Sequence, residues 1–203
     1  MRVFHFMQKQ HAISNLERFR LKVATLDSMN DPYELFLNFD GASRDDIEKF
    51  KEHFTVKSGF LCFSKNLHDP VQWAHYADNH RGICWEFDIP AHLLNRIEYG
   101  EEPINLAQRD EDWRDNLVKA TLRKYDGWSY EQEYRILVDL EAEEIIRESG
   151  LHFVKLEKIV FPTRVYAGIR CELSAEEKEL FYRNDLEVIQ MAQDHRSYSI
   201  IPA

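Results

Sequence analysis

Two glutamates in a Glu-x-Glu arrangement are the residues of this chain whose type and spacing could carry out chemistry. Glu131 and Glu133 lie within residues 128–138, a segment that ends in an apolar run typical of a β-strand. Side chains alternate along a strand, so a strand here would place Glu131, Glu133 and Arg135 on one face. Such a rigid pair can hold one carboxylate for bond cleavage and one for an acceptor. An ordinary half-buried antiparallel sheet also turns a polar face of this kind toward water.

The elements that must position these glutamates are short strands interspersed with helices. Without regular β-α-β alternation, this pattern predicts an α+β fold, with a mixed or mostly antiparallel sheet flanked by helices, in a single domain over residues 1–203. Strands are expected at residues 3–6, 21–26, 58–64, 83–89, 128–138, 152–156, 158–161 and 186–190, and helices at residues 12–19, 43–54, 110–125 and 175–184.

Two Asp-Pro pairs indicate where helical turns begin. Asp31 and Asp69 each precede a proline, which fits the first position of a helix, so both aspartates are predicted N-caps. Glu34 is expected to reach back to the first cap, as in a capping box. The helix after Asp69 carries Trp73, which we interpret as a packing anchor.

Composition excludes several classes of partner. A formal net charge of −10 argues against nonspecific binding to nucleic acid, which requires clustered Lys and Arg. No stretch approaches the roughly 20 apolar residues of a membrane span, so no membrane partner is expected. The cysteines Cys62, Cys84 and Cys171 are scattered and odd in number, which favours reduced thiols and a cytoplasmic location.

Histidines offer no convincing metal site. His75 and His80 stand five residues apart on the predicted helix, where their directions diverge, and no cysteine pair accompanies them. We therefore predict no metal ligands, and interpret His75 as a buried hydrogen-bonding residue. On the first strand, the side chain of His5 faces the opposite side from those of Phe4 and Phe6. It becomes a candidate functional residue only in combination with the carboxylates.

The order of motifs resembles a bacterial family of domains of unknown function. The resemblance covers nearly the whole chain and implies no established activity. It rests on the segments NDPYE (30–34), CFS (62–64), WAHYADNHRG (73–82), WSYEQEYR (128–135) and FPTRVYAG (161–168).

A more remote resemblance is to the ADP-ribosyltransferase superfamily, whose members place a His or Arg on an early strand, a Ser or Tyr centrally and a Glu on a late strand. His5, then Ser64 or Tyr76, then the Glu131–Glu133 pair follow that order. The resemblance implies that NAD is the substrate, bound by His5, Ser64 and Tyr76. It further implies that Glu133 serves the ribose as the catalytic carboxylate and that Glu131 serves the acceptor.

The chain also departs from that superfamily. Phe6 follows His5 where a His-Gly pair is usual, and Cys62-Phe63-Ser64 stands in place of Ser-Thr-Ser.

Three functions remain open from the sequence. The first is a cytoplasmic bacterial NAD-using transferase, similar to ADP-ribosyltransferases, in a toxin or defence system with a small nucleotide as its ligand. The second is a non-catalytic ligand-binding, sensor or interaction module in which Glu131, Glu133 and Arg135 form a solvated charge ladder. The third is a metal-dependent nuclease that uses the glutamate pair. The acidic net charge disfavours it, as does Arg135 at the position where a lysine would be expected.

Overall fold

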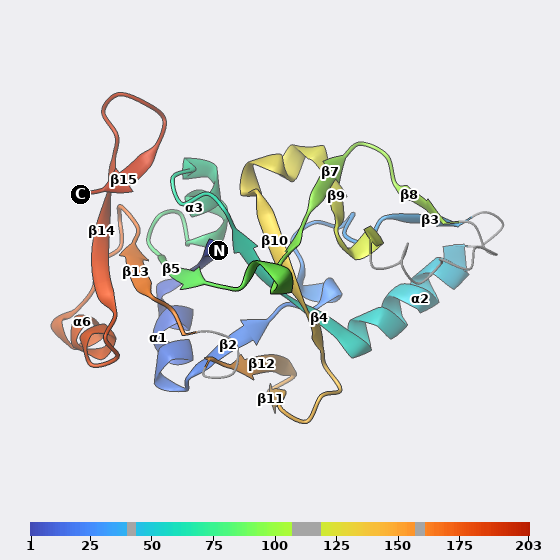
Figure 1. The fold of residues 1–203 in the computed structure, drawn as a ribbon, viewed down its shortest axis with the longest axis horizontal. Coiled ribbons are helices and arrows are strands. Elements are labelled where there is room, and N and C mark those ends of the chain that lie inside the picture. Colours follow the sequence, from blue (N-terminus) through green and yellow to red (C-terminus); the bar gives the residue numbers. More distant parts are fainter. Residues whose placement is uncertain (40–43, 107–118, 157–160) are drawn as a thin grey trace.

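An eight-stranded mixed sheet runs through the molecule in the computed structural model, which describes residues 1–39, 44–106, 119–156 and 161–203 (Figure 1). Every pairing in this sheet is antiparallel except that of β13 with β14. In spatial order its strands are β15 (Ile200–Pro202), β14 (Glu187–Gln193), β13 (Arg164–Ala167), β5 (Ile83–Asp88), β1 (Arg2–Met7), β4 (Ser58–Ser64), β10 (Glu133–Asp139) and β6 (Asn95–Arg96).

Smaller sheets extend this frame. A three-stranded antiparallel sheet contains β11 (Ile146–Glu148), β12 (Leu151–Lys155) and β2 (Arg20–Val23). Two parallel pairs join β3 (Leu37–Phe39) to β8 (Ile104–Leu106) and β7 (Glu98–Gly100) to β9 (Arg123–Tyr125). The fold is therefore α+β with mostly antiparallel sheets, as predicted from the sequence.

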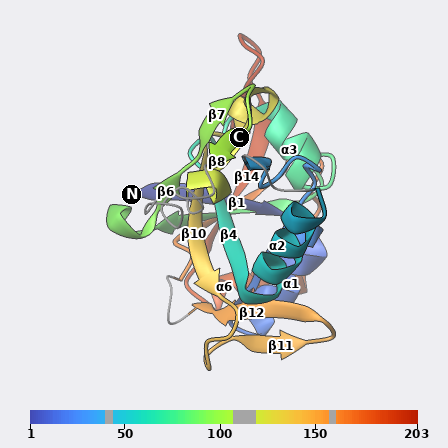
Figure 2. The same ribbon diagram turned by 90° about the vertical axis from the view of Figure 1, so that its right-hand side faces the viewer.

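Helices pack on the sheet edges and faces. Helix α1 packs against β2 and α6, α2 against β4, and α3 against β1. In the view of Figure 2, α1, α2 and α3 are all drawn to the right of strand β4. The helices are α1 (Lys9–Glu17), α2 (Arg44–Lys57), α3 (Pro70–Tyr76) and α6 (Ala175–Tyr182), with 3₁₀ turns η1 (Leu26–Ser28), η2 (Ala91–Leu93) and η3 (Asp126–Glu131).

The hydrophobic core divides along strand β1, whose side chains alternate between two clusters. Val3 and Met7 belong to the larger cluster, and Phe4 and Phe6 belong to the smaller one. Trp73 is fully buried in the smaller cluster, with its ring 5.1 Å from that of Phe6. Its role as a packing anchor is confirmed.

The predicted strand over residues 128–138 is wrong in its first half. Residues up to Glu131 form η3, Gln132 adopts a left-handed conformation with φ of 45°, and β10 begins only at Glu133. The left-handed residue ends η3, so Glu131 and Glu133 belong to different elements. The predicted helix at 110–125 lies partly outside the described residues, and its described end is wrong because Arg123–Tyr125 form strand β9. The predicted strand at 158–161 also lies partly outside the described residues.

Both Asp-Pro pairs begin turns as predicted. The Asp69 carboxylate accepts hydrogen bonds from the backbone amides of Val71 and Gln72 at 2.8 and 3.1 Å. Asp31 accepts one from the Tyr33 amide at 2.9 Å. Glu34 does not close a capping box, however, because its carboxylate pairs with Arg135.

We expect Asp69→Ala to destabilise the protein by roughly 0.5–2 kcal/mol, because two amides of the first turn of α3 lose their acceptor. Urea unfolding followed by circular dichroism measures the change. Asp27→Ala is the matched control, since Asp27 is an exposed aspartate in the short turn η1. Equal stability of the two variants would contradict the capping role.

Candidate functional site

Three strands that are distant in the sequence place the predicted site residues side by side. Strand β4 lies between β1 and β10, and Ser64 is in register with Phe4 on one side and with Glu133 on the other. His5 follows Phe4 directly. The early, central and late residues expected from the sequence therefore meet where the end of β4 and the start of β10 lie beside the middle of β1.

All five predicted residues line one cavity of about 100 Å³. His5, Ser64 and Glu133 come from the strands, Tyr76 from α3 and Glu131 from η3. The arrival of Tyr76 and Glu131 from different elements means that the cavity is a product of tertiary structure.

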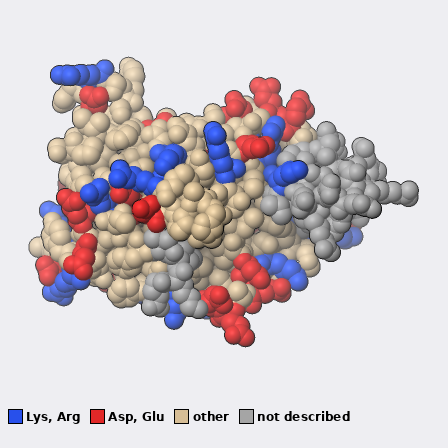
Figure 3. All heavy atoms as spheres, viewed as in Figure 1, with Lys and Arg blue, Asp and Glu red and all other residues tan. Residues whose placement is uncertain are grey.

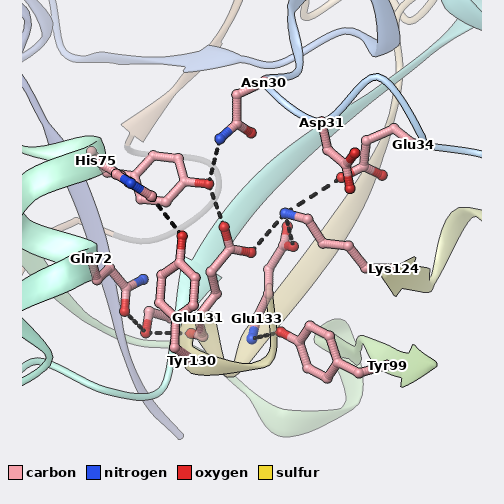
Figure 4. Close-up of polar contacts among 12 residues, drawn as sticks. Asn30, Asp31, Glu34, Gln72, His75, Tyr99, Lys124, Tyr130, Glu131 and Glu133 are labelled. Atoms are coloured by element: carbon pink, nitrogen blue, oxygen red, sulfur yellow. Dashed lines mark hydrogen bonds and ion pairs between the residues drawn. The ribbon is translucent and has the colours of Figure 1, made fainter. Parts of the chain in front are cut away.

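A buried network of ion pairs forms one wall of this cavity (Figure 4). It contains one more carboxylate than cation, and none of its members is more than 5% exposed. The members are Glu34, Glu131, Glu133, Lys124 and Arg135. The solvated charge ladder expected for a binding module is therefore wrong, because the turn at residues 31–35 and strand β9 cover this face of β10.

Arg135 is the structural centre of the network. It forms paired contacts with Glu34 at 2.6 and 3.0 Å and with Glu133 at 2.6 and 3.1 Å. A fifth bond, of 2.9 Å, reaches the carbonyl oxygen of Thr121. These contacts use all five donors of the guanidinium, which is fully buried, so Arg135 has no donor left for a ligand.

Lys124 bridges the glutamates. Its Nζ atom lies 2.7 Å from Glu131, 3.4 Å from Glu133 and 3.5 Å from Glu34. Burial alone would lower the pKa of Lys124, but the three carboxylates outweigh it and raise the pKa. Lys124 therefore remains an ammonium group between Glu131 and Glu133.

The two glutamates of the motif have pKa values shifted in opposite directions. Burial raises the pKa of Glu131 in spite of the Lys124 ammonium. Burial acts in the same sense on Glu133, but Arg135 and Lys124 outweigh it and lower the pKa of Glu133 to about 2. When the pKa values of two neighbouring carboxylates differ in this way, one carboxylate can transfer a proton while the other stays ionised and stabilises positive charge.

Tyr76 connects Glu131 to the cavity. Its hydroxyl donates a hydrogen bond to Glu131 and accepts one from the Asn30 amide at 2.9 Å. Burial, and then the Glu131 charge, raises the pKa of Tyr76. The phenol therefore stays protonated and acts as a donor to Glu131.

Ser64 holds the turn that carries Glu131. Its Oγ atom lies 2.7 Å from the Glu131 carbonyl oxygen and 2.9 Å from Gln72 Oε1, and it accepts a bond from the Asn66 amide. Ser64 is only 2% exposed. We therefore interpret it as a positioning residue rather than the cofactor contact that the sequence predicted.

His5 is neutral and oriented by the backbone. Its Nδ1 atom lies 2.7 Å from the Cys62 carbonyl oxygen, which can only accept, so Nδ1 carries the proton and Nε2 is the acceptor. Burial lowers the pKa of His5 and keeps the ring uncharged.

Three aromatic side chains group beside Tyr76. The Trp128 and Tyr130 rings lie 6.1 Å apart, and Nδ1 of His75 lies 2.7 Å from the Tyr130 hydroxyl. His75 is exposed, so the prediction that it is buried is wrong; its predicted hydrogen bond is present.

Sequence reasoning missed three residues that build the wall. Glu34 belongs to the conspicuous Asn-Asp-Pro-Tyr-Glu segment but was interpreted as a cap. Lys124 and Tyr99 belong to no motif in the sequence that would indicate a functional role. In the structure, the Tyr99 hydroxyl accepts a hydrogen bond of 2.8 Å from the backbone amide of Glu133. Such partners arise from contacts between distant segments, which periodicity does not reveal.

The position between the glutamates is filled by Lys124 Nζ, which leaves a metal ion no place between them. No group of three or more His, Cys, Asp or Glu side chains among the described residues could hold a metal ion. Figure 3 shows acidic and basic side chains interspersed over the described part of the face in view.

No family model, curated protein or solved structure matches this chain. Among the helices of the described residues, none has the length and apolar character needed to cross a membrane.

We expect the network to make stability depend on pH. Glu133 has its pKa lowered from 4.5 to about 2 in the folded state, so its contribution is complete above about pH 4.5 and is lost as the pH falls toward 2. This contribution is on the order of 1–3 kcal/mol. Glu131, whose pKa is raised, acts in the opposite sense and contributes most at low pH.

Urea unfolding of the wild type, Glu133→Gln and Glu131→Gln between pH 3 and pH 7 measures these contributions. Glu133→Gln should flatten the loss of stability on acidification below about pH 4.5. Glu131→Gln should remove the fall in stability that the wild type shows as the pH rises above about 4.5, because the contribution of Glu131 that is lost with rising pH is absent. Parallel curves for all three proteins would contradict the assignment.

Proposed function

We propose that the cavity binds the nicotinamide end of NAD and that the protein is an NAD-using transferase, similar to ADP-ribosyltransferases. The observation that carries this proposal is the adjacency of β1, β4 and β10, which brings His5, Ser64 and Glu133 to one cavity. The sequence resemblance names these residues in this order but says nothing about their distances.

The ionised carboxylate of Glu133 suits cleavage of a glycosidic bond. When the bond from ribose C1′ to the nicotinamide nitrogen breaks, its electron pair returns to the ring and leaves positive charge on the ribose. A fixed carboxylate stabilises that charge more in the transition state than in the bound substrate, which lowers the barrier. Its pKa of about 2 keeps Glu133 ionised at neutral pH.

Glu131 suits the acceptor side of the reaction. The acceptor forms a new bond to ribose C1′ and must lose a proton as it does so. A carboxylate whose pKa is raised by burial accepts that proton more readily than an ordinary glutamate. Tyr76 and Lys124 hold Glu131 in place through its two oxygens.

The size of the cavity limits what enters it. At about 100 Å³ it is smaller than the roughly 300–1,000 Å³ of most small-molecule sites. It therefore accommodates a single ring such as nicotinamide, while the remainder of the dinucleotide lies outside. Neutral His5 and the aromatic walls formed by Phe4 and Phe63 match the polar and apolar parts of such a ring.

A second candidate is a non-catalytic ligand-binding or sensor module. The observation that favours it is the internal pairing of Glu133, whose oxygens already contact Arg135 and Lys124. In that reading the network sets the shape of the cavity, and a small ligand binds without being cleaved.

We place the protein in the bacterial cytoplasm, within a toxin or defence system. The compartment is supported by the free thiols Cys62, Cys84 and Cys171. The biological role rests on the family resemblance alone.

The proposal predicts nicotinamide release from NAD by the wild-type protein when an acceptor protein or nucleic acid is present. Glu133→Gln should lower this rate by roughly 10²–10³-fold, since one electrostatic contact to the transition state is lost. This variant should also have a lower melting temperature, because Arg135 loses a buried partner.

Two further variants separate activity from stability. Glu86→Gln removes another buried carboxylate of the same sheet that lies outside the cavity, so it controls for destabilisation. Tyr76→Phe keeps the ring but removes the hydroxyl bonded to Glu131, and should reduce turnover with little loss of stability. If the wild type releases no nicotinamide and NAD does not raise its melting temperature, the transferase proposal fails. Stabilisation by NAD without turnover would favour the binding module.

A further inference from the structure

A second cavity lies on the other side of strand β9. Its volume is about 310 Å³, within the range of small-molecule sites. Side chains alternate on β9, so the Lys124 ammonium reaches the carboxylate network while Arg123 and Tyr125 point toward the second cavity; Lys124 also lines both cavities. One short strand thus contributes to two sites of different chemistry.

Three exposed aromatic rings line this second cavity. Tyr33, Phe36 and Tyr125 are 58%, 46% and 54% exposed, and the first two rings lie 5.4 Å apart with planes inclined at 72°. Aromatic rings exposed together around a hollow are typical of surfaces that bind a partner or ligand.

Two glycines make room for the side chains that line the cavity. A Cβ atom on Gly100 would lie 1.9 Å from Nη2 of Arg123, and one on Gly127 would lie 2.6 Å from Cε1 of Tyr125. The backbone therefore packs directly against the guanidinium and the ring. Any larger residue at either position would displace the side chain it supports.

Hydrogen-bond donors and acceptors lie beside the aromatic rings of this cavity. The Nε atom of Arg123 is buried and has no hydrogen-bond partner, and no ion pair of this guanidinium is found among the described residues. The exposed carboxylates of Glu101 and Glu102 also line the cavity. The site therefore combines a guanidinium donor, carboxylate acceptors and flat apolar faces.

We propose that this cavity binds an amino-purine nucleobase. The base stacks on the rings of Tyr33, Phe36 and Tyr125, as bases stack on aromatic platforms elsewhere. Arg123 donates to the ring nitrogen on one edge of the base, and Glu101 or Glu102 accepts from its exocyclic amino group. The proposal goes beyond the transferase function and requires none of the glutamates of the first cavity.

Titration calorimetry with adenosine tests the proposal, because adenosine supplies the base without a phosphate. We expect saturable binding to the wild type and weaker binding of inosine, which carries a carbonyl in place of the amino group. Tyr125→Ala should weaken adenosine binding by roughly 5- to 150-fold, the loss that removal of one stacking ring produces. Arg123→Met should also weaken it.

Controls separate this site from the rest of the molecule. Tyr182→Ala removes a ring of similar exposure, 55%, on helix α6 and should leave adenosine binding unchanged. Gly100→Ala removes no contact with the base, yet it should weaken binding by displacing the Arg123 guanidinium. Melting curves check that each variant is folded.

The two proposals fail separately. Tyr76→Phe should lower nicotinamide release while adenosine binds as before, and Tyr125→Ala should weaken adenosine binding whether or not NAD is cleaved. The nucleobase proposal is overturned if the wild type does not bind adenosine at millimolar concentration. Equal binding of adenosine by the wild type, Tyr125→Ala and Arg123→Met would overturn it as well.

Discussion

The pairing of buried Arg135 with two glutamates is the constraint on which the rest of the site depends. A guanidinium buried away from water needs carboxylates to balance its charge and an acceptor for each of its N–H donors. Here Glu34, Glu133 and the Thr121 carbonyl oxygen accept from all five donors. These contacts connect the turn at residues 31–35 and the segment before β9 to strand β10. Removal of either glutamate would leave buried charge unpaired, so the geometry of the cavity and the stability of the fold are coupled.

Lys124 gives this network its chemical asymmetry. The ammonium lies closer to Glu131 than to Glu133, yet Glu133 also pairs with Arg135 and therefore has the lower pKa. One glutamate is kept ionised, and burial raises the pKa of the other. A ligand that binds to Glu133 must share or replace the Lys124 contact, which makes this lysine part of any mechanism at the cavity.

The three-residue strand β9 contributes side chains to both cavities. Its alternation directs the Lys124 ammonium toward the carboxylates and Arg123 and Tyr125 toward the second cavity, and Lys124 lines both cavities. The parallel partner β7 provides Tyr99, which accepts the Glu133 amide, and Gly100, which makes room for Arg123. A change in the pairing of these two strands would alter both cavities together.

Local signals in the sequence determined the class of fold, the strand at Ser58–Ser64, the cap at Asp69 and the order in which His5, Ser64 and the glutamates occur. Each signal depends on residues a few positions apart, where alternation and capping act. The tertiary structure decided that Glu131 lies in a turn and that Glu34 and Lys124 join the network. Arg135 and Glu34 are 101 residues apart, and pairing over such a distance depends on the burial of whole segments rather than on local preference.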